Sequence, residues 1–127
     1  MKKLFTSFLY FFLIMSLFAF SNCKKEANDT FCSTNRTSIE SLNNKTGVVI
    51  YYQKYSKYGV RIDTSFAANI DSQVIGLTCD LPKELQNEGT NVTVSGQLKK
   101  FNSEENISPQ TAGDELYYLK ISQITKR

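Results

Sequence analysis

The chain of 127 residues contains no histidine and no tryptophan. Histidine is the commonest general acid or base near neutral pH and the commonest zinc ligand, so its absence argues against the best-known hydrolytic and zinc-dependent sites. The sequence also lacks a glycine-rich phosphate loop, a nucleophile elbow and a spaced pair of carboxylates. The adjacent pairs Glu104–Glu105 and Asp114–Glu115 are interpreted as solvated. These absences favour a binding or accessory module without metal or cofactor, and an enzyme with an unfamiliar site is the alternative.

Excess charge of one sign is also lacking once the first residues are set apart. The whole chain has 15 basic and 12 acidic side chains, a net charge of +3. Lys2 and Lys3 belong to a leader without acidic residues, so the remainder has 13 basic and 12 acidic side chains, a net charge of +1. Because nucleic-acid binding depends on neutralising phosphates, this balance argues against nucleic acid as a partner. Lys99 and Lys100 are interpreted as a solvated strand end.

The first 22 residues have the order of a secretory signal. A positive start, Met1–Lys3, precedes a mostly apolar run, Leu4–Phe20, and Ser21-Asn22-Cys23 follows. Because it ends on a cysteine, this leader resembles a bacterial lipoprotein signal. The resemblance implies that signal peptidase II cleaves before Cys23 and that the Cys23 thiol carries diacylglycerol. The domain would then lie outside the cytoplasm, on the cell membrane or the outer membrane; an uncleaved anchor is the alternative and gives the same orientation.

The segment after the leader is predicted to be a tether. Residues 23–46 are rich in Ser, Thr, Asn and charged side chains, a composition typical of linkers. One helical turn is expected within it, at Thr37–Leu42. The folded domain is then predicted to span residues 47–127.

Two cysteines remain once Cys23 is assigned to lipid. An even pair in an exported protein suggests a disulfide, so Cys32 and Cys79 are predicted to be bonded, and two free thiols are the alternative. Cys79 falls on the same strand face as Ile75 and Leu77, so its side chain is expected to point inward.

The stretch around Pro82 is predicted to be a short helix followed by a strand. Pro82 suits the first helical position, and Leu85 provides an apolar contact for a helix of about two turns. Gly89 is expected in the left-handed conformation that ends such a helix. Residues 92–98 then alternate between apolar and polar side chains, as in a half-buried strand. Gly96 within this run predicts a bulge or a bend.

Four further runs with a period of two predict strands. They span residues 47–54, 58–63, 73–79 and 117–122. The first two are expected to form a hairpin. Phe66 and Ile70, in the loop at 64–71, are expected to tuck under the fold. Ile124 is out of phase with the last run, which predicts a bulge near Ser122.

The predicted order is three strands, one short helix and two strands, which is the order of an OB-fold. The predicted fold is therefore all-β: a small five-stranded OB-like barrel with one short helix between strands 3 and 4. Closure also removes edge strands, and an open sandwich or meander is the alternative. The side chains expected to line the interior are Val60, Ile62, Ile75, Leu77, Val92, Val94, Leu119 and Ile121, with Leu81 and Leu85 at one end.

The run from Tyr58 to Leu98 carries the pattern Cys79-x-Leu81-Pro82-x-x-Leu85, followed by Gly89-x-x-Val92-x-Val94-Ser95-Gly96. This pattern resembles a group of small lipoproteins from Bacteroidota-type bacteria, and the resemblance covers most of the mature chain. Its motifs are structural: a helix start, a helix stop and a strand bend. The resemblance therefore implies a fold and an envelope location, and no active site.

The candidate ligand-binding residues are Tyr51, Tyr55, Arg61 and Tyr118, which are expected to face outward. Such groups on the sheet face of an OB-fold, together with the loops between strands 1–2 and 4–5, bind oligosaccharides, peptides or single strands. Ordinary cross-strand packing of tyrosines is the alternative. The predicted function is a lipid-anchored envelope module that binds a glycan, a peptide or a partner protein without catalysis.

Overall fold

The computed structural model describes residues 30–33, 35–63 and 71–127. The leader, Cys23, Phe66 and Ile70 lie outside these ranges, so the predictions made for them stay predictions. The described residues are mostly β, with short 3₁₀ turns and no α-helix. The strands are β1 (Ser38–Tyr52), β2 (Lys57–Ile62), β3 (Gln73–Leu77), β4 (Asn91–Lys99) and β5 (Asp114–Lys126).

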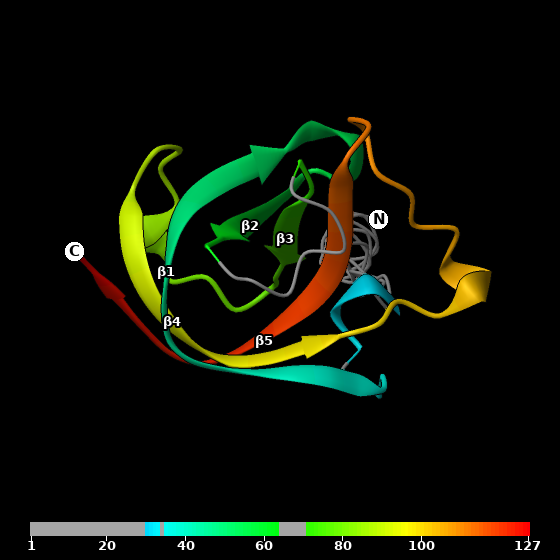
Figure 1. Ribbon diagram of the computed structural model, residues 1–127, viewed down its shortest axis with the longest axis horizontal. Helices are drawn as coiled ribbons and strands as arrows, with labels where there is room; N and C mark the ends of the chain where they lie inside the picture. Colours follow the sequence, from blue (N-terminus) through cyan, green and yellow to red (C-terminus); the bar gives the residue numbers. More distant parts are fainter. Residues whose placement is uncertain (1–29, 34, 64–70) are drawn as a thin grey trace, which may run out of the picture.

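The five strands close into a barrel in the order β1-β2-β3-β5-β4, with β4 paired back onto β1. Only the β3–β5 pair among them is parallel. Figure 1 shows β1, drawn from cyan to green, curving around the interior. Its first part pairs with β4 and its last part with β2. The predicted closed five-stranded barrel and its first hairpin are confirmed, and the open sandwich is wrong.

The first strand begins at Ser38, within the predicted tether, and not at residue 47. The predicted helical turn at Thr37–Leu42 is wrong, because this segment is extended and pairs with β4, beginning with Ser38 opposite Lys99. Leu42 is buried in the barrel core. Ile39 also packs against this core, so ladder hydrogen bonds and two apolar side chains extend the strand through a polar stretch.

The predicted helix between β3 and β4 is only a 3₁₀ turn, Lys83–Leu85. Pro82 keeps an extended ψ of 141° and accepts a hydrogen bond from the Leu85 N–H at 2.9 Å. Gln86 then leaves the turn and donates its side-chain amide to the Leu81 carbonyl, so no i to i+4 ladder develops. Leu81 and Leu85 are buried against the core as expected. Gly89 has a φ of +84°, so its left-handed conformation is confirmed, but the turn ends at Gln86 and not at Gly89.

The bulge in the β4–β5 pair confirms two expectations. Gly96 lies opposite Ile121 while the preceding residue lies opposite Gln123, so Ser122 has no partner across the ladder. A Cβ atom on Gly96 would lie 2.2 Å from the Lys120 carbonyl oxygen. Only glycine permits this approach, and it lets the two strands bend around the core.

The interior of the barrel is a single apolar cluster. Its members are Leu42, Val49, Val60, Ile62, Val74, Leu81, Leu85, Val92, Val94, Leu98 and Leu119, with Ile121 packed at its side. The predicted phase of β3 is wrong. Val74 belongs to the interior, and a Cβ atom on Gly76 would lie 2.7 Å from the Leu119 Cβ. Ile75 and Leu77 therefore lie on the outer face, because side chains alternate along a strand.

An outer cluster covers that face. It consists of Tyr52, Ile75 and Leu77, with Phe31, Ile50, Tyr55, Phe101 and Leu116 packed against them. The 3₁₀ turn Thr30–Cys32 brings Phe31 onto this cluster, 5.4 Å from the Phe101 ring centroid. A disulfide joins Cys32 to Cys79, so the pairing favoured by the sequence is present. Cys79 is exposed, not inward, because β3 has already ended at Leu77.

A buried arginine holds the same segment in place. The Arg36 side chain is 1% exposed and donates to Glu105 from Nε, at 3.1 Å, and from Nη2. It also donates to three backbone carbonyls of residues 30–33. Its guanidinium lies over the rings of Tyr118, at 4.7 Å, and Phe101, at 5.1 Å. Glu105 is therefore not a solvated loop carboxylate: hydrogen bonding to Arg36 lowers its pKa.

Candidate functional site

The candidate site lies where the turn between β1 and β2 meets the long loop between β4 and β5. The turn is the 3₁₀ segment Gln53–Tyr55, and it ends at Ser56, which has a φ of +51°. The Tyr55 hydroxyl donates to the Ser108 carbonyl at 2.9 Å and accepts from its N–H at 2.8 Å. Lys54 Nζ donates to the Ser108 Oγ at 2.7 Å. The two loops are therefore fixed to each other.

A second link sets Tyr52 at the base of the site. Tyr52 is the last residue of β1 and is buried. Its ring stacks on Tyr55, with centroids 6.0 Å apart and an interplanar angle of 6°. Its hydroxyl accepts from the Gln110 N–H and lies 3.5 Å from an Asp114 carboxylate oxygen. Burial, together with Asp114, raises the pKa of Tyr52, so this hydroxyl is a neutral hydrogen-bonding group and not a base.

Tyr55 differs from Tyr52 in its surroundings. Burial alone would raise its pKa, but the hydrogen bonds to Ser108 and the Lys54 ammonium outweigh burial, and its pKa lies below the ordinary value. The Lys54 Nζ also lies 5.5 Å from the centre of the Tyr55 ring. These contacts fix Lys54 against the loop.

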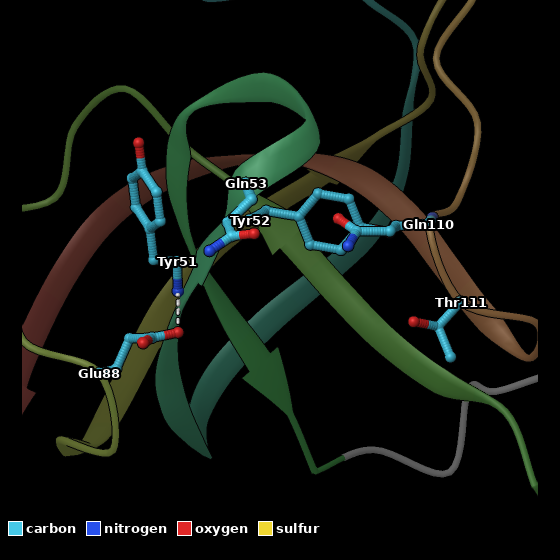
Figure 2. A pocket seen from close by; sticks show the side chains of 6 residues that line it. All are labelled: Tyr51, Tyr52, Gln53, Glu88, Gln110 and Thr111. Carbon is cyan, nitrogen blue, oxygen red and sulfur yellow. Dashed lines mark hydrogen bonds between the residues drawn. The ribbon is translucent and has the colours of Figure 1, made fainter.

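The loop pocket between these segments has a volume of about 300 Å³. Its lining residues are Tyr51, Tyr52, Gln53, Glu88, Gln110 and Thr111. Figure 2 shows Tyr51 and Glu88 on one side, Gln110 and Thr111 on the other, and Gln53 and Tyr52 between them. The pocket therefore joins the end of β1, the residues before β4 and the loop before β5.

Most polar side chains that line the loop pocket form no hydrogen bond with other described residues. Glu88 Oε1 accepts from the Tyr51 backbone N–H at 3.0 Å, which fixes the carboxylate at the rim. Within the described part of the chain, the side chains of Gln53, Gln110 and Thr111 form no hydrogen bond. Two amides and one hydroxyl can therefore bind a ligand.

The structure brings together only part of the predicted binding set. Tyr51 is 37% exposed and lines the pocket, and its ring meets Tyr58 edge-on at 5.0 Å across the β1–β2 ladder. Tyr55 is half-buried and fixes the pocket wall. Arg61 is exposed, but its side chain lies on the opposite face of the β1–β2 pair from that of Tyr51. Tyr118 lies on the outer face, opposite Leu77, but it is covered by Arg36 and is 1% exposed, so its predicted exposure is wrong.

Two further interpretations from the sequence need correction. Lys99 is buried, while Lys100 is exposed, so only the second lysine is a solvated strand end. Glu115 accepts a hydrogen bond from the Tyr117 hydroxyl at 3.1 Å and is not simply solvated. Burial and Glu115 together raise the pKa of Tyr117. In the ranges that the structure describes, no three His, Cys, Asp or Glu side chains are grouped to hold a metal.

Sequence reasoning missed five lining residues: Tyr52, at the end of β1, and Gln53, Glu88, Gln110 and Thr111. The last four are common polar residues in three loops, and none belongs to a motif. The available signal was the OB-like strand order, which places the loops between strands 1–2 and 4–5 near each other.

Compared with known proteins, the chain matches no protein-family model and no curated protein. Across residues 30–33, 35–63 and 71–127, no helix has the length and apolar character needed to cross a bilayer.

Proposed function

We propose that this chain is a lipid-anchored envelope lipoprotein whose barrel is a non-catalytic binding module for a glycan, a peptide or a partner protein. The loop pocket is the observation that carries the proposal. Hydrogen bonds between the opposite loop and the side chains of Tyr55, Lys54 and Tyr52 hold its walls together. A pocket formed before the ligand arrives loses little conformational freedom on binding.

The strand order supports an OB-like assignment. An OB-fold is a five-stranded Greek-key barrel, and its loops between strands 1–2 and 4–5 flank the ligand. The present barrel has the order β1-β2-β3-β5-β4, and the corresponding loops supply Gln53, Gln110 and Thr111 to the pocket. A 3₁₀ turn stands where the helix of an OB-fold is expected.

The outer cluster restricts where a ligand can bind. Many OB-folds bind ligands on the sheet face of strands 2 and 3. Here Ile75 and Leu77 of β3 are buried in the outer cluster, and Phe31 packs on the same cluster. The proposed binding position is therefore the loop pocket and not this face.

Lipid attachment rests on the leader and on Cys23. The disulfide at Cys32 would limit the distance between lipid and barrel. At 3.3–3.6 Å per residue, residues 24–31 span at most about 29 Å. A lipid-anchored barrel would therefore meet ligands close to the membrane surface.

Replacement of the acylated cysteine tests the anchor. The Cys23→Ser variant is expected to lose a metabolic palmitate label and to remain uncleaved, whereas Cys32→Ser, the matched control, keeps the label. Fractionation and intact mass provide the readout. If Cys23→Ser leaves membrane attachment, processing and mass unchanged, lipidation at this residue is wrong.

Purification of the native lipoprotein tests the binding module. A glycan, peptide or protein is expected to co-purify with the wild-type chain and to be lost from Tyr51→Ala. The exposed control Lys120→Ala, on β5 and outside the lining of the pocket, should retain it. Chemical turnover of the retained molecule by the purified chain would instead support the alternative, an enzyme with an unfamiliar site.

A further inference from the structure

The loop pocket carries information about the charge and shape of its ligand. We propose that it binds an uncharged carbohydrate, either one sugar ring or the end of a neutral oligosaccharide. This inference rests on the proposed binding function and assigns a chemical class to the ligand.

The hydrogen-bonding groups match a sugar. Each glutamine amide, Gln53 and Gln110, offers both donors and an acceptor, and the Thr111 hydroxyl does both. Sugar hydroxyls also donate and accept, so they can pair with all three side chains. The second oxygen of Glu88, which does not receive the Tyr51 N–H, adds an acceptor for a sugar hydroxyl.

The aromatic wall matches the other surface of a sugar ring. Among the described residues, Tyr51 is the large hydrophobic residue whose side chain is exposed. Its edge-on contact with Tyr58 fixes its orientation. Binding pockets typically combine aromatic walls with a few placed polar groups, and the C–H face of a sugar ring can pack against such a ring. Polar groups around an aromatic wall suit a ligand that is polyhydroxylated but partly apolar.

The charge of the pocket disfavours anions. Glu88 is the charged side chain among the lining residues, and neither lysine nor arginine lines the pocket. Lys54 lies nearby in the sequence, but it does not line the pocket, and its ammonium is held on Ser108 of the opposite loop. A phosphate or a uronic acid would therefore meet a carboxylate and no cation among the lining side chains. This arrangement separates neutral sugars from nucleotides and acidic glycans.

The closed barrel disfavours an extended peptide. Peptides commonly bind by adding a strand to an exposed sheet edge, and here each strand pairs on both sides. The volume of about 300 Å³ lies at the lower end of small-molecule pockets. It therefore fits a small ligand or a chain end better than a long segment.

Saturation-transfer NMR on the full-length lipoprotein in lipid nanodiscs tests the inference, because nanodiscs avoid detergents with sugar headgroups. The neutral probes are N-acetylglucosamine, cellobiose and maltotriose. Glucuronic acid and glucose 6-phosphate are the anionic probes, and tri-alanine is the peptide probe. We expect a neutral sugar to bind, and Tyr51→Ala or Gln110→Ala to weaken it about tenfold, the loss of one good contact. Gln123→Ala, an exposed glutamine on β5, should leave affinity unchanged.

The Glu88→Gln variant separates charge from shape. It keeps an oxygen that can accept the Tyr51 N–H but removes the negative charge. The affinity for glucuronic acid relative to the uncharged probes is expected to rise about tenfold, as for removal of one like-charge contact. Glu84→Gln, an exposed control outside the pocket, should not change that ratio. Circular dichroism melts of each variant establish that it is folded.

The outcomes distinguish the two proposals. Tri-alanine binding that depends on Tyr51, without binding of any sugar, would overturn the carbohydrate inference and leave the binding function standing. Equal binding of neutral and anionic sugars would also overturn it. If no probe binds and Tyr51→Ala keeps every co-purifying molecule, both proposals fail.

Discussion

Replacing Arg36 with methionine is expected to destabilise the protein strongly. Methionine keeps an apolar stem but removes a guanidinium that is almost fully buried and bonded to Glu105 and to residues 30–33. Removing one partner of a buried ion pair costs about 3–5 kcal/mol, whereas an exposed pair is worth about 0–1 kcal/mol. The Glu105 side chain is 15% exposed and can regain water. We therefore expect the lower part of the buried range, about 3 kcal/mol.

A matched variant separates charge from hydrogen bonding. Glu105→Gln keeps an acceptor oxygen for the guanidinium but replaces a charged hydrogen bond by a neutral one, which should cost about 1–2 kcal/mol. Lys120→Met, an exposed lysine on β5, should change stability by about 0.5 kcal/mol or less. The double variant Arg36→Met with Glu105→Gln should cost less than the sum, because the two side chains interact directly.

Urea unfolding of the full-length chain with its disulfide intact gives the free energy from the midpoint and the slope. A loss of less than about 1 kcal/mol for Arg36→Met, with an unchanged slope, would contradict a stabilising role of the buried guanidinium. Such a result would mean that residues 30–36 and the loop at Glu105 contribute little to the folded state. If the two losses of free energy of unfolding simply add in the double variant, the two side chains do not interact, which would contradict the ion pair.

Opening the Cys32–Cys79 bond by Cys79→Ser should cost roughly 4 kcal/mol in the chain-entropy model, read as a lower urea midpoint, and alkylation of both thiols without reductant would rule the bond out. Leu85→Ala and Val94→Ala should each cost about 2–4 kcal/mol, and an unchanged melting temperature would contradict their burial. The lowered pKa of Glu105 stabilises the fold above the ordinary carboxyl pKa of about 4.3. This stability is lost as the pH falls through the lowered pKa, so Glu105→Gln should approach wild-type stability in acid, and a constant difference would refute the linkage.

The sequence predicted the strands best where only one face is apolar. In β2 and β4 the apolar side chains alternate with polar ones, so the inner face was identified correctly. In β3, Val74, Ile75 and Leu77 are all buried, and Gly76 provides no side chain to fix the phase. A strand covered on both faces has no polar side, so its phase depends on neighbouring elements that periodicity does not reveal.

The first strand was predicted too short for a related reason. The pairing of β1 with β4 shifts register between Leu42 and Lys45, and Asn44 has a φ of +47°. These irregularities break the period of two just where polar residues dominate. The segment therefore had the composition of a tether, although β4 pairs with it on both sides of these irregularities.

The loop pocket was only partly predictable. Tyr51 was identified because its aromatic ring falls near the end of an alternating run. Glu88 and Gln110 are 22 positions apart in a polar chain, and only closure of the barrel brings them to one pocket. Arg36 was missed as well, since a lone arginine in a polar segment does not indicate burial.

The segment from Phe31 to Arg36 stabilises the domain and also covers part of its outer sheet face. A small domain buries a limited fraction of its surface, and Phe31 adds an apolar side chain to a second layer outside the barrel. The disulfide and Arg36 fix that side chain in place. The same packing occupies the sheet face that OB-folds leave open for ligands. In the proposed binding module, stabilisation and recognition would therefore be divided between two regions: the outer cluster stabilises the barrel, and the loop pocket would hold the ligand.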